Sequence, residues 1–145
     1  MPYLVDTNIF IRLASRNDPK RQLTLDALTK LRSRNEILCY TPQIVSEFWT
    51  VCTRPPAERG GLGLSAEQTE RKVRVIERYF VLLPDSEATF REWRNLVASQ
   101  ALLGVAVHDA KVVASMHVHG VRNLLTDDAG FKRYTSISVV SPTEL

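Results

Sequence analysis

Short apolar runs alternate with longer amphipathic stretches along this chain. The apolar runs lie at residues 3–6, 37–40, 80–83, 123–126 and 137–140, and each is typical of a buried β-strand. Between most of these runs, apolar residues recur at helical spacing and charged residues separate them, which predicts helices with one buried face. The pattern therefore predicts an α/β domain with a mainly parallel sheet that helices cover on both faces.

Capping residues divide the amphipathic stretches into separate helices. A helix follows the first strand directly, and further helices are expected to begin at Asp18-Pro19, Thr41-Pro42, Ser65, Ser86 and His108. The last of them ends at His119, because Gly120 readily adopts the left-handed conformation that follows a helix. The helix after Ser86 is predicted to carry Phe90, Trp93, Leu96 and Val97 on one face.

The segment from Arg54 to Gly63 interrupts this regular pattern. It contains two prolines and three glycines, which predict an irregular loop. The loop is long enough to act as a surface flap or as a contact for a partner. No Lys-Ser or Lys-Thr pair follows its glycines, so it is not a phosphate-binding P-loop.

Length and composition set the class of protein. With 145 residues, the chain is expected to form one domain over residues 1–145. No apolar run approaches the roughly 20 residues of a membrane helix, and the start of the chain lacks the basic region of a secretory signal. We therefore expect a cytoplasmic protein without a membrane segment. Cys39 and Cys52 are too few for a disulfide scaffold and are expected to be buried thiols.

The charge balance gives a first indication of the partner. Lys and Arg number 19 against 16 Asp and Glu, a formal net charge of +3. If several of the acids bind a metal ion, the remaining surface is more basic than this net charge. The balance favours an anionic partner such as a polyanion, without identifying it.

Acidic residues occupy positions where the pattern expects a hydrophobic residue or the end of a strand. Asp6 follows the first strand, and Asp127 and Asp128 follow the fourth. In open α/β sheets, ligands bind at the edge formed by the carboxyl ends of parallel strands. Glu47 and Asp109 each interrupt the apolar stripe of a predicted helix. A carboxylate turned toward a core needs an arginine, a lysine or a metal ion as its partner.

A cluster of these carboxylates indicates a divalent cation. Two like charges ~4 Å apart repel by about 4 kcal/mol at an effective dielectric constant near 20, so the cluster requires a compensating positive charge. Ligands made only of oxygen select Mg²⁺ or Mn²⁺ over zinc. Such a cation offsets the charge of a phosphodiester and activates a water molecule, which predicts hydrolysis of a nucleic-acid backbone.

Taken singly, each acid also has a structural interpretation. Asp6 has the position of a strand-end cap, and Asp109 that of a first-turn acid favoured by the helix dipole. Asp127 and Asp128 have the positions of turn residues. The joint occurrence of the acids is what favours the metal site.

Four short motifs follow one another along the chain. They are Leu4-Val5-Asp6-Thr7-Asn8, Ser46-Glu47-Phe48, His108-Asp109-Ala110, and Thr126-Asp127-Asp128 with Phe131. In this order they resemble the PIN-domain family of ribonucleases, and within it the VapC-type toxins of prokaryotic toxin–antitoxin pairs, over essentially the whole chain. The resemblance implies a three-layer α/β/α sandwich, a bound Mg²⁺ or Mn²⁺, and endonucleolytic cleavage of RNA.

The resemblance also assigns roles to individual acids. Asp6 and Asp109 match the positions that hold the metal most directly, and Glu47 matches the third acid. Asp128 fits the fourth acid best, because the family pattern places a phenylalanine three residues after it, and Asp127 remains an alternative.

Polar neighbours and protein partners complete what the resemblance implies. Thr7, Asn8 and Thr126 match positions that orient an acid, a water molecule or a phosphate, a role that suits short hydroxyl and amide groups. Membership of the family further implies a homodimer and an antitoxin that blocks the acidic cleft. The segment from Arg54 to Gly63 is longer than a minimal toxin of this type needs.

Two other functions compete with the nuclease. A catalytically idle PIN-like module that binds RNA or a protein is compatible with the same motifs. An aspartyl-phosphate enzyme is not, because Asn8 stands where haloacid-dehalogenase-like phosphotransferases need a second aspartate two residues after the first.

Overall fold

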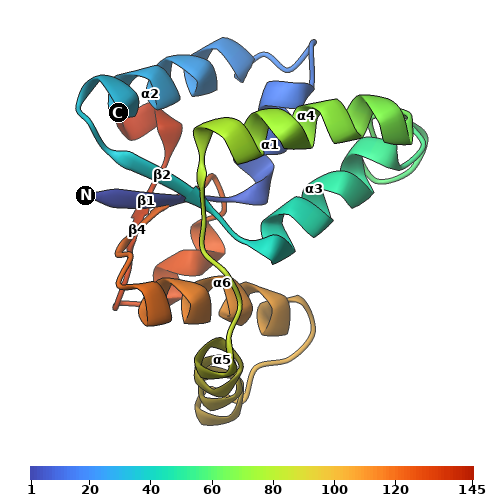
Figure 1. The fold of residues 1–145 in the computed structure, drawn as a ribbon. Coiled ribbons are helices and arrows are strands. Elements are labelled where there is room, and N and C mark those ends of the chain that lie inside the picture. Colours follow the sequence, from blue (N-terminus) through green and yellow to red (C-terminus); the bar gives the residue numbers. More distant parts are fainter.

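The computed structural model describes all 145 residues and shows strands and helices in alternation (Figure 1). Two short 3₁₀ helices, η1 (Ala129–Arg133) and η2 (Pro142–Glu144), lie near the end of the chain. The other elements, in chain order, are β1 (Pro2–Val5), α1 (Thr7–Ala14), α2 (Arg21–Ser33), β2 (Ile37–Tyr40), α3 (Pro42–Thr53), α4 (Ala66–Tyr79), β3 (Val81–Leu82), α5 (Glu87–Ser99), α6 (Val105–His119), β4 (Asn123–Leu125) and β5 (Ser138–Val140).

The five strands form one parallel sheet in the order β3-β2-β1-β4-β5. The first strand is central, and the chain builds the sheet outward from it in one direction with β2 and β3 and in the other with β4 and β5. The order of the strands therefore reverses between β1 and β4. Ligands of open α/β sheets bind beside such a reversal, at the carboxyl ends of the strands.

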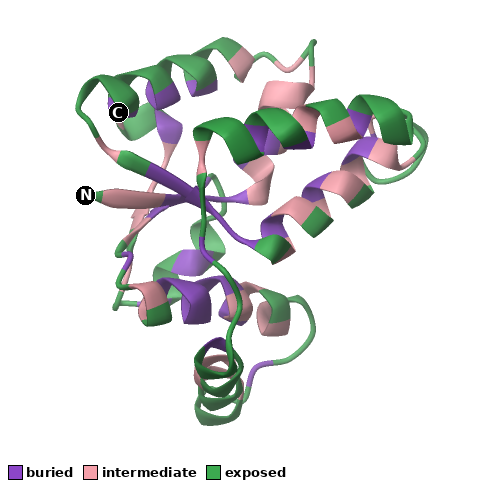
Figure 2. Ribbon diagram, viewed as in Figure 1, coloured by how far each residue is buried: buried purple, intermediate pink, exposed green.

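Helices cover both faces of the sheet. In Figure 1, α1 to α4 lie above and to the right of the strands, and α6 and α5 lie below them. The strand residues Leu4, Val5, Leu124 and Leu125 are fully buried, and buried positions in Figure 2 follow the strands and the helix faces that turn toward them. The predicted α/β/α sandwich with a parallel sheet is confirmed. Strands covered on both faces are apolar along their length, which is why the sequence pattern revealed them.

Most of the predicted helix starts are confirmed by capping geometry. The Thr41 hydroxyl accepts a hydrogen bond from the Ile44 N–H at 3.2 Å, and Ser65 and Gln68 form a reciprocal capping box. Gly120 ends α6 with a positive φ of 67°. Asp18 does not cap α2, which begins at Arg21, because its carboxylate accepts instead from the Lys20 N–H in the preceding turn at 2.8 Å.

The start of α6 differs from the prediction and changes the interpretation of Asp109. This helix begins at Val105, directly after Gly104, whose φ of 60° suits a glycine. Asp109 therefore lies beyond the first turn, which contains no acidic residue. The interpretation of Asp109 as a first-turn acid favoured by the helix dipole was wrong.

The apolar face of α5 contributes little to the core of the domain. Phe90 is 57% exposed, and Trp93, Leu96 and Val97 are only partly buried. The one buried residue of this helix is Thr89. The physical reason is visible in Figure 1, where α5 lies beyond α6 and does not reach the sheet.

Two smaller expectations have clear outcomes. Cys39 and Cys52 are both buried and free, as predicted. None of the helices combines the length and the apolar character that crossing a membrane requires.

Candidate active site

An open cavity of about 480 Å³ brings together acids that are far apart in the sequence. Its wall contains Asp6 directly after β1, Glu47 on α3, Asp109 on α6 and Asp128 shortly after β4. The cavity lies where the order of the strands reverses, because Asp6 continues from β1 and its N–H donates to the Leu125 carbonyl of β4 at 3.0 Å. Folding thus places four of the predicted acids around one space.

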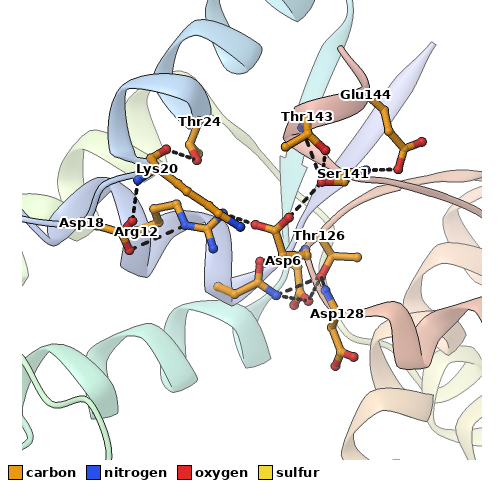
Figure 3. A network of polar contacts seen from close by, with 12 residues as sticks. Asp6, Arg12, Asp18, Lys20, Thr24, Thr126, Asp128, Ser141, Thr143 and Glu144 are labelled. Carbon is orange, nitrogen blue, oxygen red and sulfur yellow. Dashed lines mark hydrogen bonds and ion pairs between the residues drawn. The ribbon is translucent and has the colours of Figure 1, made fainter.

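Asp6 is held from three directions. It is the N-cap of α1, where one carboxylate oxygen accepts from the Thr7 N–H at 2.8 Å. The other oxygen accepts from the Asn8 side-chain amide at 3.1 Å and from the Thr126 hydroxyl at 2.8 Å (Figure 3). The carboxylate is only 6% exposed and cannot turn without losing these bonds. Its interpretation as a strand-end cap is also correct, since the same residue caps the helix and faces the cavity.

Thr126 links the two acids that follow β1 and β4. Its hydroxyl donates to Asp6 and accepts from the Asn8 amide at 2.8 Å and from the Asp128 N–H at 3.0 Å. Asp128 in turn caps η1, where its carboxylate accepts from the Gly130 N–H at 2.8 Å. One buried hydroxyl therefore positions both acids.

Glu47 is oriented by neighbours from its own helix and from α1. The Thr7 hydroxyl donates to one carboxylate oxygen and the Gln43 amide to the other, both at 2.8 Å. The same Gln43 amide donates to the His108 carbonyl at 3.1 Å, which connects Glu47 to α6 next to Asp109. Gln43 was not predicted as a site residue, and its position four residues before Glu47 was the only signal in the sequence.

Asp127 has a different environment from Asp128. One of its oxygens pairs with the Arg12 guanidinium and the other accepts from the Ser141 hydroxyl at 2.9 Å. The Arg12 Nε also lies 3.7 Å from the Asp18 carboxylate, so this arginine contacts acids on two sides (Figure 3). Asp128 lines the cavity and Asp127 does not. Arg12 and Asp18 also line it, and no motif in the sequence pointed to them.

The acids affect one another's protonation. Burial raises the pKa of Asp6 to about 6, although hydrogen bonds from Thr126 and Thr7 oppose this, and the charges of Glu47 and Asp109 raise it further. Burial also raises the pKa of Asp109, and the charges of Asp128 and Glu47 act in the same direction. The cavity therefore concentrates negative charge that its own residues do not fully neutralise.

The chemistry of these donors fits a hard divalent cation. Every acid of the cavity wall offers only oxygen. The charges of neighbouring acids contribute, after burial, to the raised pKa values of Asp6 and Asp109, and a cation would offset this repulsion. No three acidic, histidine or cysteine side chains converge closely enough to form a ready-made metal site. Binding would therefore require Glu47, Asp109 and Asp128 to turn toward Asp6, whose own orientation is fixed by hydrogen bonds.

Comparison with known proteins identifies the family. The family model described as PIN domain matches residues 3–136, nearly the whole chain. The chain belongs to the PIN-domain family, and the resemblance seen in the four motifs is confirmed. A search of curated proteins found no significant match.

Solved structures of toxin–antitoxin systems share this fold. VapBC2 from Rickettsia felis, bound to a promoter DNA fragment, aligns with a TM-score of 0.71 at 14% identity and covers 97% of this chain and 98% of its own. VapBC-1 from nontypeable Haemophilus influenzae aligns with a TM-score of 0.68 at 21% identity over 99% of both chains. VapC20 of Mycobacterium tuberculosis, described as a sarcin–ricin loop cleaving toxin, aligns with a TM-score of 0.63 at 15% identity, over 90% of this chain and 93% of its own. At these identities the likeness is one of fold.

Proposed function

We propose that this protein is the toxin of a toxin–antitoxin pair and acts as an endoribonuclease that hydrolyses RNA phosphodiester bonds. The observation that carries the proposal is the convergence of Asp6, Glu47, Asp109 and Asp128 on one cavity. Membership of the PIN-domain family supports it, as does the fold shared with VapC20, a toxin described as cleaving the sarcin–ricin loop.

These four acids would hold Mg²⁺ or Mn²⁺, which suits a donor set made only of oxygen. When bound, the cation supplies charge compensation for the phosphate and activation of a water molecule. The part of the protein is to hold Asp6 in a fixed orientation, toward which the other carboxylates turn. Thr126 and Asn8 fix Asp6 by hydrogen bonds of 2.8 and 3.1 Å, so the acid nearest the sheet is oriented before any ligand arrives.

The remaining polar residues play the same positioning role at the other acids. Thr7 donates a hydrogen bond to Glu47 across the gap between α1 and α3. Thr126 accepts from the Asp128 N–H and so fixes the turn from which that carboxylate extends. Loss of either hydroxyl should lower activity without removing any acid.

We also propose a protein partner and a dimer. A cognate antitoxin is supported by the fold shared with a structure described as a toxin–antitoxin complex from Klebsiella pneumoniae. An antitoxin that covers the acidic cavity would restrain the nuclease. The homodimer rests on the family alone and is tested by the mass of the purified protein in solution.

Cleavage of RNA by purified protein tests the nuclease directly. Wild type, Asp109→Asn and the control Asp26→Asn are incubated with a panel of structured RNAs in Mg²⁺, Mn²⁺ or EDTA. Asp26 is a suitable control because it is exposed on α2 and does not line the cavity. We expect metal-dependent cleavage by wild type and by Asp26→Asn, and a loss of about 100-fold or more in Asp109→Asn.

Two results would contradict this function. Wild-type cleavage by Asp109→Asn would remove this residue from the site. Absence of metal-dependent cleavage by wild type, together with retained binding of RNA or of a protein, would identify a catalytically idle binding module instead.

A further inference from the structure

Arg59 adds an uncommitted positive charge to the acidic cavity. It belongs to the segment from Arg54 to Gly63 between α3 and α4, and it lines the cavity together with Gly60. The other arginine of the wall, Arg12, is paired with Asp127 and lies close to Asp18. The Arg59 guanidinium forms no ion pair or hydrogen bond with the rest of the chain, whereas its backbone carbonyl accepts from Arg54 at 3.1 Å. Its side chain is therefore free to bind a ligand.

The backbone that carries Arg59 is fixed to α3. The Leu62 N–H donates to the Val51 carbonyl at 3.1 Å, and the Leu64 N–H donates to the Cys52 carbonyl at 2.8 Å. The Gly61 N–H closes a turn on the Glu58 carbonyl at 2.8 Å. These bonds connect the segment to the helix that carries Glu47, so the position of Arg59 relative to the acids is set by the fold.

Arg59 also has an unfavourable backbone conformation. Its φ of 38° lies in the left-handed region, which non-glycine residues seldom adopt and which costs free energy. The adjacent Gly60, with a φ of 72°, shares this turn at no such cost. A glycine at position 59 would relieve this strain. The arginine therefore occupies a position where the backbone conformation favours glycine.

The charges of the cavity explain what this side chain can bind. Five acids line the wall, and an RNA strand entering it is repelled by each of them that is ionised. A guanidinium matches the geometry of a phosphate with two parallel hydrogen bonds, and it stays charged at every physiological pH. An uncommitted arginine in the wall of this cavity is therefore suited to hold a phosphate group in an otherwise repulsive site.

We propose that Arg59 binds a backbone phosphate of the RNA substrate next to the bond that is cleaved. This inference rests on the proposed nuclease function and extends it with a residue that the four motifs do not contain. Arg59 is a positioning residue in this scheme. It holds the strand across the cavity, and the acids carry the chemistry.

The test compares Arg59→Gln with Arg94→Gln, which removes the same charge from an exposed position on α5, away from the cavity. The probe is a mixed-sequence single-stranded RNA of about 20 nucleotides, because a phosphate contact does not depend on sequence. Binding is measured in Ca²⁺ at several salt concentrations, and kcat and KM are measured in Mg²⁺. Thermal unfolding of each variant verifies that the fold is intact.

We expect Arg59→Gln to weaken RNA binding about five- to tenfold and to reduce the slope of log Kd against log salt by about 0.7, the value for one phosphate contact on a single strand. KM should rise by a similar factor with kcat within about twofold of wild type. The RNA affinity of Arg59→Lys should lie between those of wild type and Arg59→Gln, because lysine keeps the charge without the paired hydrogen bonds. Arg94→Gln should behave as wild type.

The binding and cleavage results separate the two proposals. If Arg59→Gln binds RNA as tightly as Arg94→Gln, or wild type does not bind the RNA, the role of Arg59 is wrong even where cleavage is observed. If binding depends on Arg59 but Mg²⁺ produces no cleavage, the role of Arg59 stands and the nuclease function is wrong. A fall in kcat with unchanged Kd would also overturn the inference, since Arg59 would then act on the reaction and not on binding.

Discussion

Replacing Asp6 with asparagine should stabilise the metal-free protein at neutral pH, although it removes a central acid of the site. The pKa of Asp6 rises from its usual 3.8 to about 6 on folding, mainly because the carboxylate is buried. Between these two values the folded protein keeps a proton that the unfolded chain has released. The free energy of unfolding therefore falls as the pH rises from about 4 to 6, and it levels off above the folded pKa.

The size of the stabilisation follows from the difference between the folded and unfolded pKa values of Asp6 and from the hydrogen bonds that an asparagine would lose. At 1.36 kcal/mol per pKa unit, the buried charge costs about 3 kcal/mol at pH 7.5 and about half of that at pH 5. An asparagine has one acceptor oxygen and cannot accept from Thr7, Asn8 and Thr126 together, which costs about 1 kcal/mol for each bond lost. We expect Asp6→Asn to be more stable than wild type by about 1 to 2 kcal/mol at pH 7.5 and about equal to it at pH 5.

Thermal or urea unfolding in EDTA at both pH values measures this difference. For a chain of this length, 1 kcal/mol corresponds to about 3 °C in Tm, so the shift at pH 7.5 should be about 3 to 6 °C. The decisive quantity is how much the stability difference between Asp6→Asn and wild type changes from pH 5 to pH 7.5. We expect a change of about 1 to 2 kcal/mol, in which the effects of other groups largely cancel. A difference that is the same at pH 5 and pH 7.5 would refute the explanation by charge burial, whatever its size.

Three further changes probe other parts of the structure. Asp128→Asn should lower metal-dependent RNA cleavage by about 100-fold and Asp127→Asn by less than about tenfold, because only Asp128 lines the cavity. Equal losses in a parallel cleavage assay would contradict this distinction. Thr126→Val, a buried substitution of similar shape, should lower the free energy of unfolding in urea by about 2 to 3 kcal/mol, because it removes three hydrogen bonds. A loss below about 0.5 kcal/mol would show that these bonds contribute little. Gly61→Ala places a methyl group 2.4 Å from two backbone carbonyl oxygens and should cost about 1 to 3 kcal/mol by the same measurement, whereas wild-type stability would show that the loop adjusts freely.

The order of the elements followed from local physics. Buried parallel strands must be apolar throughout, and helices on their faces must repeat at 3.6 residues, so both leave a readable pattern in the sequence. Caps such as Thr41 and Ser65 act within one turn of a helix and could be recognised from neighbouring residues alone. The exposure of the apolar face of α5 could not be recognised in this way, because this helix packs on α6 and not on the sheet.

The candidate site was predictable to the extent that an acid conflicted with its local pattern. Asp6 and the pair Asp127 and Asp128 follow strands, and Glu47 interrupts an apolar stripe, so these positions could be recognised without a structure. Gln43, Arg12 and Arg59 did not conflict with any pattern and were missed. Their positions at the cavity, or beside its acids, depend on elements distant in sequence.

The choice between Asp127 and Asp128 shows what the sequence determined and what only the tertiary structure decided. The sequence alone identified the strand end and its two consecutive acids, because strand signals and acidic residues are local features. Which acid turns into the cavity depends on Arg12 from α1 and Ser141 from beyond β5, which hold Asp127 elsewhere. Arg12 and Asp127 lie 115 positions apart, and Ser141 reaches Asp127 from the far side of β5. Both contacts form only when the sheet assembles, so the local pattern around Asp127 carries no record of them.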